Sequence, residues 1–283
     1  FQQAVKFNPM SPVYNADGTF GRPPGGRGDN PLANLLGRQN ELVQDRFNGN
    51  AYLEIKPIPE LTGRVNGGVE IAHYSICKYL PRSTYQGGID GGVASASDYA
   101  STRQLFDGTL TYNKTFNDVH ALTVLGGYAY EKTYYSFRSF SVSGFSTDLY
   151  GFNNMDAAST ITGSNYYKQE NILISFFGRL NYSYNDKYLL TFTLRRDGSS
   201  RFGANHRWGS FPSGAFAWRL DREDFIRNLN LFSNLKFRLG YGQTGNDQIG
   251  NYAAYALMAT TRLTFDGNTN TAGSHLNQSS PEN

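Results

Sequence analysis

The chain has 283 residues, of which 17% are charged and 15% are aromatic, including 20 Tyr and 20 Phe. Ordinary soluble domains carry about 25% charged residues, and a formal net charge of +3 is too small to indicate a nucleic-acid-binding protein. The single cysteine, Cys77, excludes an internal disulfide bond and a metal site built from several cysteines. No apolar run approaches the ~18 residues of a transmembrane helix.

From the N-terminus, residues 1–48 are rich in Pro, Gly and Asn, which predicts a long loop with a short helical turn near residues 32–36. After this loop, alternation of apolar and polar side chains predicts successive β-strands. Strands are expected at residues 51–56, 61–74, 102–116, 120–134, 172–184, 188–194, 208–220 and 235–241. A short helical turn is expected within 221–234, and the remainder is expected to be mostly loop, with a further strand around 252–265.

The strand pair at 172–194 shows this alternation most clearly. Its even-numbered positions are almost all apolar on both arms, whereas the odd-numbered positions include Ser175, Arg179 and Asn181. Each arm is longer than the common strand of about 5–6 residues. The pattern predicts a sheet that is wetted on one face and meets an apolar environment on the other, for which a transmembrane β-barrel is the natural candidate.

The connections between the predicted strands alternate in length. They are short at 57–60, 117–119 and 185–187, and long at 75–101 and 136–167. Outer-membrane barrels have short periplasmic turns and long extracellular loops, which a β-sandwich has no reason to imitate. Tyr182, Tyr184 and Tyr188 lie beside one short turn and predict a periplasmic aromatic girdle. The sequence therefore predicts an all-β, antiparallel barrel segment, an arc of about eight to ten strands from a larger barrel with long extracellular loops.

Between residues 170 and 252 the chain carries ordered and specific blocks. The first runs Arg195-Arg196-Asp197-Gly198-Ser199-Ser200-Arg201-Phe202-Gly203, followed by Arg207-Trp208-Gly209, Phe211-Pro212-Ser213 and Ala217-Trp218-Arg219. The second runs Asn234-Leu235-Lys236-Phe237-Arg238, followed by Gly240-Tyr241-Gly242-Gln243-Thr244-Gly245-Asn246. With shorter likenesses at 12–15 and 50–54, the chain resembles SusC/RagA-like TonB-linked outer-membrane proteins over nearly its whole length.

This resemblance implies a barrel of about 22 strands, occluded by an N-terminal plug, that imports large nutrients such as glycans and sometimes peptides. It implies no enzymatic activity, a location in the Gram-negative outer membrane, a SusD-like surface lipoprotein as partner, and energy delivered through TonB. The chain opens FQQAVKFNPM, which lacks the basic and apolar segments of a signal peptide. We therefore expect residues 1–283 to be part of a single barrel domain, without the plug, the TonB box, the signal peptide or the closing C-terminal strand.

Two other functions compete with active import. A passive outer-membrane porin has the same kind of wall, and a plug with a TonB box would separate the two. A soluble β-sandwich that binds carbohydrate predicts instead that the apolar strand faces pack against a second sheet. In that case Ile174, Phe176, Phe192 and Leu194 would be buried in a core.

Two sets of residues are candidates for contact with a substrate or with the interior of the barrel. Aromatic rings pair well with the apolar C–H faces of sugars, so aromatic residues of the long loops are candidate substrate contacts. These residues are Trp208, Tyr150, Tyr166 and Tyr167. The charged residues on the polar strand parity are candidates to line the lumen and contact the plug: Arg64, Glu70, Arg179, Arg195, Lys236 and Arg238.

Other motifs fit ordinary loops better than special chemistry. Residues 240–245 match the pattern G-x-G-x-x-G, but the residues that follow are a poor helix start, which argues against dinucleotide binding. A hydrolytic triad is disfavoured because its candidate members share one polar loop without a strained elbow. These candidates are Asp197, Ser199, Ser200 and His206.

No cofactor is predicted, and the four histidines show no ligand spacing. Asp90, Asp98 and Asp247 could join a calcium site in the extracellular loops, but nothing in the sequence fixes one.

Overall fold

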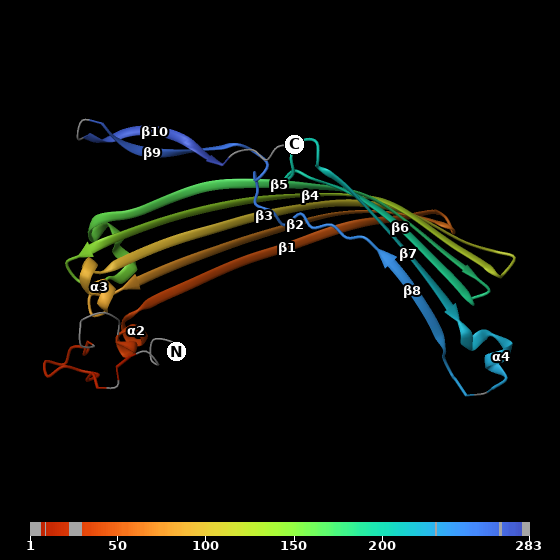
Figure 1. The fold of residues 1–283 in the computed structure, drawn as a ribbon, viewed down its shortest axis with the longest axis horizontal. Helices are drawn as coiled ribbons and strands as arrows, with labels where there is room; N and C mark the ends of the chain where they lie inside the picture. Colours follow the sequence, from red (N-terminus) through yellow and green to blue (C-terminus); the bar gives the residue numbers. More distant parts are fainter. Residues whose placement is uncertain (1–6, 9, 23–29, 230, 266–267, 279–283) are drawn as a thin grey trace. The chain divides into compact units, whose positions relative to one another are not determined.

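The computed structural model describes residues 7–8, 10–22, 30–229, 231–265 and 268–278. Its main feature is an eight-stranded sheet in which β1 to β8 lie side by side in chain order (Figure 1). β5 pairs antiparallel with β6, β6 with β7, and β7 with β8, and a separate antiparallel sheet joins β9 and β10. Consecutive antiparallel neighbours form an up-and-down arrangement, which is the topology of a barrel wall.

The structure gives the following bounds. The strands are β1 (Gln39–Ile58), β2 (Leu61–Leu80), β3 (Val93–Phe116), β4 (His120–Phe145), β5 (Ala158–Tyr184), β6 (Tyr188–Ser199), β7 (Trp208–Arg219), β8 (Lys236–Gly242), β9 (Leu257–Phe265) and β10 (Asn268–Gln278). The helices are α2 (Pro31–Gly37), α3 (Tyr85–Asp90), η1 (Gly151–Ala157), η2 (Leu220–Arg222) and α4 (Asp224–Arg227). The two helical turns predicted from sequence are confirmed. Among the described residues, no helix is both long enough and apolar enough to cross a bilayer.

The first five strands are longer than the sequence predicts. β1 begins at Gln39, inside the stretch predicted as a loop, and β3, β4 and β5 extend far into the predicted loops at 75–101 and 136–167. In these extensions both faces carry Ser, Thr, Asn and Tyr, so no one-sided apolar alternation marks them as strands. β10 likewise occupies residues that were expected to be loop.

Two of the short connections are built in the same way. Asn117 and Asp118 have φ of 49° and 59°, and Asn185 and Asp186 have φ of 49° and 53°. Positive φ at both central positions is what a type I′ hairpin turn requires, and Asn and Asp tolerate it better than other side chains. The backbone N–H of Lys187 donates to the carbonyl of Tyr184 at 2.9 Å and closes the second turn.

Contacts divide the chain into two units. Unit 1 comprises Phe1–Phe47, Glu70–Thr102 and Tyr134–Gln169, and unit 2 comprises Asn48–Val69, Arg103–Thr133 and Glu170–Asn283. The hydrophobic cluster of unit 1 consists of Tyr79, Ala94, Val142 and Phe145. The Tyr79 and Phe145 rings meet edge to face with centroids 5.4 Å apart, a favourable aromatic geometry.

A polar hub closes this cluster. The Tyr79 hydroxyl donates to Asp148 at 2.6 Å, and the Nε of Arg82 donates to the same carboxylate at 3.3 Å. Burial works to raise the pKa of Asp148, but the hydrogen bonds from Tyr79 and Arg82 outweigh it and hold the pKa below its ordinary value. The connections before β3 and after β4 are therefore held together as ordered structure.

Candidate functional site

The register of β5 to β8 sorts the side chains onto two faces. We call one the polar face, formed by the odd-numbered positions of β5, β6 and β7 and the even-numbered positions of β8, and the other the apolar face. Pairs on the polar face include Arg179 with Thr193, Arg195 with Phe211 and Arg238 with Ala217. Four of the six predicted lumen residues thus share one face: Arg179, Arg195, Lys236 and Arg238.

The other two predicted lumen residues lie on β2. The guanidinium of Arg64 sits 4.1 Å from the centroid of the Tyr52 ring, a cation–π contact. Glu70 lies 3.8 Å from Arg46, which also donates to the Tyr74 hydroxyl at 2.6 Å. These contacts hold both charges within the sheet, and contact of the six residues with a plug stays a prediction.

A segment after β8, residues 243–255, is tied to the ends of β5, β6 and β7. Arg201 donates from Nε to the Asn251 side chain at 2.9 Å and from Nη1 to the Asp247 carbonyl at 3.0 Å. The Ser199 hydroxyl donates to the Asp247 carboxylate at 3.3 Å. Gly245 lies against the Phe211 ring so closely that a Cβ at this position would overlap it. Arg201 therefore acts as the main fastener of the 243–255 segment.

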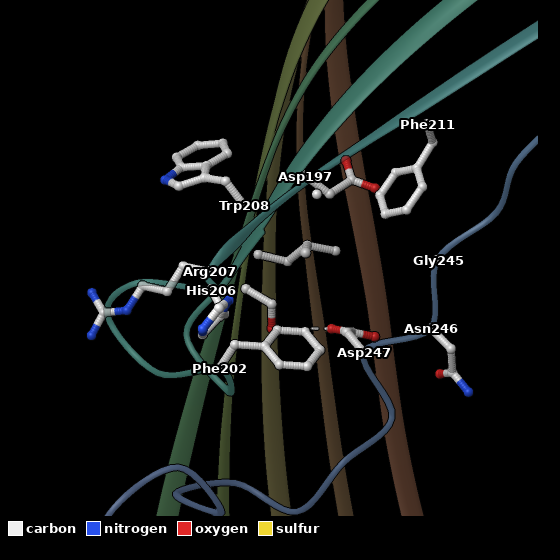
Figure 2. Close-up of a pocket in the computed structure, with 12 residues that line it drawn as sticks. Asp197, Phe202, His206, Arg207, Trp208, Phe211, Gly245, Asn246 and Asp247 are labelled. Atoms are coloured by element: carbon white, nitrogen blue, oxygen red, sulfur yellow. Dashed lines mark hydrogen bonds between the residues drawn. The ribbon is translucent and has the colours of Figure 1, made fainter. Parts of the chain in front are cut away.

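A cavity of about 320 Å³ lies where this segment meets β6 and β7. Figure 2 shows Phe202, Phe211 and Asp197 among the residues around it. The Nε of Arg195 is 2.8 Å from both carboxylate oxygens of Asp197, and Arg195 also donates to Ser175 at 3.0 Å. The lining combines aromatic rings with carboxylate and amide acceptors, which suits noncovalent contact with a polar molecule.

The suspected triad residues are occupied by structural contacts. The hydroxyl of Ser199 donates to Asp247, and that of Ser200 accepts from the backbone N–H of Ile172 at 2.8 Å. Within the described ranges, no hydrogen bond is found between His206 and either serine, and no cluster of three His, Cys, Asp or Glu side chains could hold a metal ion. The calcium candidate Asp98 lies instead between His73 and Arg138, each at 3.9 Å.

The apolar face is bounded by two aromatic belts. In the first, the Tyr188 ring stacks between Tyr184 at 6.3 Å and Trp218 at 6.1 Å. In the second, the Phe176 ring lies 5.2 Å from Tyr128 and 6.0 Å from Trp208. The guanidinium of Arg196 sits 5.5 Å from the Trp208 centroid. From Tyr188 to Arg196 the strand rises about 26 Å at ~3.3 Å per residue, close to the ~25 Å apolar band of membrane barrels.

Large apolar side chains between the belts remain exposed. Between the belts, Leu190, Phe192 and Leu194 expose 48%, 53% and 46% of their surface, and Phe176 in the second belt exposes 50%. A sandwich core would bury these residues. Of the four residues expected in such a core, Phe176, Phe192 and Leu194 are exposed and Ile174 is only partly buried, so the expectation attached to the soluble β-sandwich is wrong.

The first belt is anchored by Glu223 in the connection between β7 and β8. Its carboxylate accepts from the Tyr188 hydroxyl at 2.8 Å, from Trp218 Nε1 at 3.1 Å and from Lys187 Nζ at 3.1 Å. The hydrogen bonds from Trp218, Tyr188 and Lys187 hold the pKa of Glu223 below its ordinary value. One ionised carboxylate thus fixes two aromatic rings of the belt.

The four aromatic candidates fall in different places. Trp208 belongs to the second belt on the apolar face, and its ring points away from Phe211 (Figure 2). Tyr150 is 53% exposed at the start of η1, and Tyr166 is 61% exposed beside Lys168, whose Nζ is 5.8 Å from the ring. Tyr167 packs against the rings of Tyr135 and Phe137. A substrate role stays a prediction for each.

Sequence reasoning did not single out the partners of Tyr167 or the Arg201 fastener. Tyr135 and Phe137 lie where β4 was expected to have ended, so their alternation was not read. The signal available in the sequence was that Tyr135 and Phe137 are two positions apart, as side chains on one face of a strand are. Arg201 was quoted within a family block, but its long-range contacts have no local signature.

Consecutive antiparallel strands, a polar face and an exposed apolar face bounded by two aromatic belts define part of the wall of a transmembrane β-barrel. No protein-family model matches the chain. It is 35% identical over 254 residues to TonB-dependent receptor P3 of Formosa agariphila, covering 89% of this chain and 25% of that protein. It is 53% identical over 89 residues to TonB-dependent receptor SusC of Bacteroides thetaiotaomicron, covering 31% and 9%.

Among solved structures, the RagAB peptide transporter superposes with a TM-score of 0.78 at 26% identity, covering 92% of this chain and 28% of that chain. The chain belongs to the SusC/RagA-like TonB-dependent receptors, a family of transporters rather than enzymes. It spans about a quarter of the length of the first curated relatives it matches.

Proposed function

We propose that the protein containing this chain is an active importer of large nutrients in the Gram-negative outer membrane, energised through TonB. The observation that carries the proposal is the pair of aromatic belts around an exposed apolar band, in a chain similar to SusC and to the RagAB transporter. In water, such a band would be an aggregation-prone surface, whereas lipid covers it at no cost.

The connection lengths support an orientation for this wall. The turns at 117–119 and 185–187 face the periplasm, and the long connections around α3 and η1 face the cell exterior. A spanning strand needs about 9–11 residues, whereas β3, β4 and β5 have 24, 26 and 27. This surplus supports an arrangement in which the outer part of these strands lies in the extracellular medium, where an importer first meets its substrate.

We further propose a SusD-like surface lipoprotein as the partner and a glycan as the imported nutrient, with a peptide as the second candidate. The similarity to SusC supports the lipoprotein partner, as does the likeness to RagAB, whose structure is that of a peptide transporter. A passive porin is the competing function, because a porin shares the wall and the belts but needs no energy.

Uptake by cells tests this proposal. The native host, a strain deleted for the full-length receptor, the complemented strain and a TonB-deficient strain would be given a labelled panel of oligosaccharides and of peptides. We expect uptake of one class to be lost on receptor deletion, restored by complementation and absent without TonB. Uptake that depends on the receptor but persists without TonB would indicate a porin, and uptake unaffected by receptor deletion would overturn the proposal.

Localisation has its own test. In the full-length protein with Cys77 replaced by Ala, Leu149→Cys in a long connection should react with a membrane-impermeant maleimide in intact cells. Val119→Cys in a short turn should react only after the outer membrane is opened. Equal reactivity of both positions in intact cells would contradict the orientation.

A further inference from the structure

Four aromatic rings gather on three adjacent strands of unit 1. We call Tyr99 of β3, Tyr135 and Phe137 of β4 and Tyr167 of β5 the tyrosine patch. The Tyr99 and Phe137 centroids are 4.6 Å apart, those of Phe137 and Tyr167 5.3 Å, those of Tyr135 and Tyr167 6.0 Å and those of Tyr99 and Tyr135 6.4 Å. The planes are tilted by 44–45°, within the range of favourable aromatic pairs.

The patch occupies the strand parity that is wetted elsewhere in the wall. All four residues are odd-numbered, as are Ser175 and Arg179, which lie on the polar face of β5. Side chains alternate along a strand, and the contacts between β3, β4 and β5 in unit 1 keep this alternation. Tyr99 meets Tyr135 on the odd positions, while Asp98 meets Arg138 on the even ones.

Charge is sharply divided between the two parities. No odd-numbered position of β3, β4 or β5 within unit 1 carries a charged residue. The odd positions nearest the patch are hydroxyl or amide residues, namely Ser97, Ser101, Ser139, Asn165 and Gln169. The charged residues of the same stretches are all even-numbered, namely Asp98, Arg138 and Lys168.

The Tyr135 phenol stays neutral. Burial, together with a hydrogen bond to Tyr167, raises the pKa of Tyr135 to about 12. Tyr167 still exposes 37% of its surface, so the patch presents ring surface and a hydroxyl to solvent. The result is an uncharged surface of ring faces surrounded by hydroxyl and amide groups, outside the membrane-spanning part of the strands.

We propose that the tyrosine patch is a binding site for the neutral sugar rings of an oligosaccharide. Sugar C–H faces pack on aromatic rings, and sugar hydroxyls exchange hydrogen bonds with Tyr, Ser, Asn and Gln side chains. The cation nearest the patch in sequence on this parity is Arg103, which is already paired with the Glu131 carboxylate at 2.7 Å, so uronic or sulfated sugars would have to compete with that carboxylate. A peptide would find no open sheet edge to extend, because β3, β4 and β5 each lie between two neighbours. This assignment rests on the proposed import function and narrows its substrate class.

Binding by the purified full-length receptor in detergent tests the site, with an array of neutral, uronic and sulfated oligosaccharides as the probe. The strongest neutral member would then be titrated by calorimetry. We expect Tyr167→Ala to weaken its binding about tenfold and Tyr167→Phe, which keeps the ring, to weaken it at most about threefold. Phe140→Ala is the matched control, because Phe140 is an exposed ring of β4 in unit 1 with the opposite parity, and it should leave binding unchanged.

The possible results distinguish failure of the site assignment from failure of the proposed function. Preference for acidic oligosaccharides, absence of any neutral ligand on the array, or equal effects of Phe140→Ala and Tyr167→Ala would overturn the site assignment. TonB-dependent uptake is measured separately in cells. If that uptake is observed but Tyr167→Ala binds the neutral oligosaccharide as well as the natural protein does, only the assignment of the tyrosine patch is rejected. Loss of the uptake phenotype itself would reject the proposed function.

Discussion

Units 1 and 2 contain parts of the same strands but are stabilised in different ways. Unit 1 buries Tyr79, Val142 and Phe145 in a small core of its own, and the charged residues of β3, β4 and β5 within it are all even-numbered. Unit 2 leaves Leu190, Phe192 and Leu194 exposed between two aromatic belts. The comparison teaches that one strand can follow two rules along its length, packing against protein in one stretch and presenting side chains to lipid in another.

The largest expected effect tests the core of unit 1. Phe145→Ala would leave a cavity beside Tyr79, which should cost about 3–5 kcal/mol of local stability. We expect rapid protease cleavage in the connections around α3 and η1 of the full-length protein, with assembly into the membrane unchanged. Assembly falling in parallel with protease resistance would show that the two units are not stabilised separately.

The next effect tests the apolar face of unit 2. Phe192→Lys would place a charge near the middle of the apolar band, at a cost of about 2–4 kcal/mol. Urea unfolding of the full-length protein in lipid vesicles should show this loss. Thr193→Lys, its neighbour on the polar face, should cost no more than about 1 kcal/mol, because it loses only the hydrogen bond from Arg179. Equal costs would contradict the assignment of the faces.

A smaller effect is expected at the fastener of the 243–255 segment. Arg201→Ala removes the hydrogen bonds to Asn251 and Asp247, which should cost about 1.5–3 kcal/mol locally. Hydrogen exchange of residues 243–255 should accelerate, while exchange in β6 stays slow. Arg207→Ala, which loses one contact to the Tyr255 hydroxyl, provides the milder control.

The smallest effect concerns the belt anchor and depends on pH. Because the folded-state pKa of Glu223 is lowered, its ionised form stabilises the protein above the ordinary carboxylate value of about 4.3. That contribution is lost as pH falls through the lowered pKa. Glu223→Gln should therefore unfold at a lower temperature than the natural protein at pH 7, and the difference should vanish at the acidic end of a pH series. A difference that grows toward acid pH would have the wrong sign.

The difference between units 1 and 2 also explains which parts of the fold the sequence could predict. The hairpin at 172–194 and the turns at 117–119 and 185–187 were predicted because one-sided apolar alternation and Asn-Asp pairs are local signals. The parts of β3, β4 and β5 that lie in unit 1 were missed because hydroxyl and aromatic residues occur on both of their faces and interrupt that alternation. Arg179, Arg195, Lys236 and Arg238 could be assigned to one face by parity alone. The Arg201 contacts and the tyrosine patch depend on strand register over long sequence separations, which no local pattern encodes.

The two Asn-Asp turns also bear on how the wall assembles. A type I′ turn brings its flanking residues into pairing with very few residues between them, so the entropy lost on closing the hairpin is small. Isolated hairpins of this kind form in roughly 1–10 μs, far faster than contacts across long connections. We therefore expect the β3–β4 and β5–β6 pairs to align from these turns and to close toward the opposite ends of the strands. In the proposed orientation, these strand pairs would assemble from the periplasmic side toward the cell surface, whereas an imported molecule would approach from the cell surface.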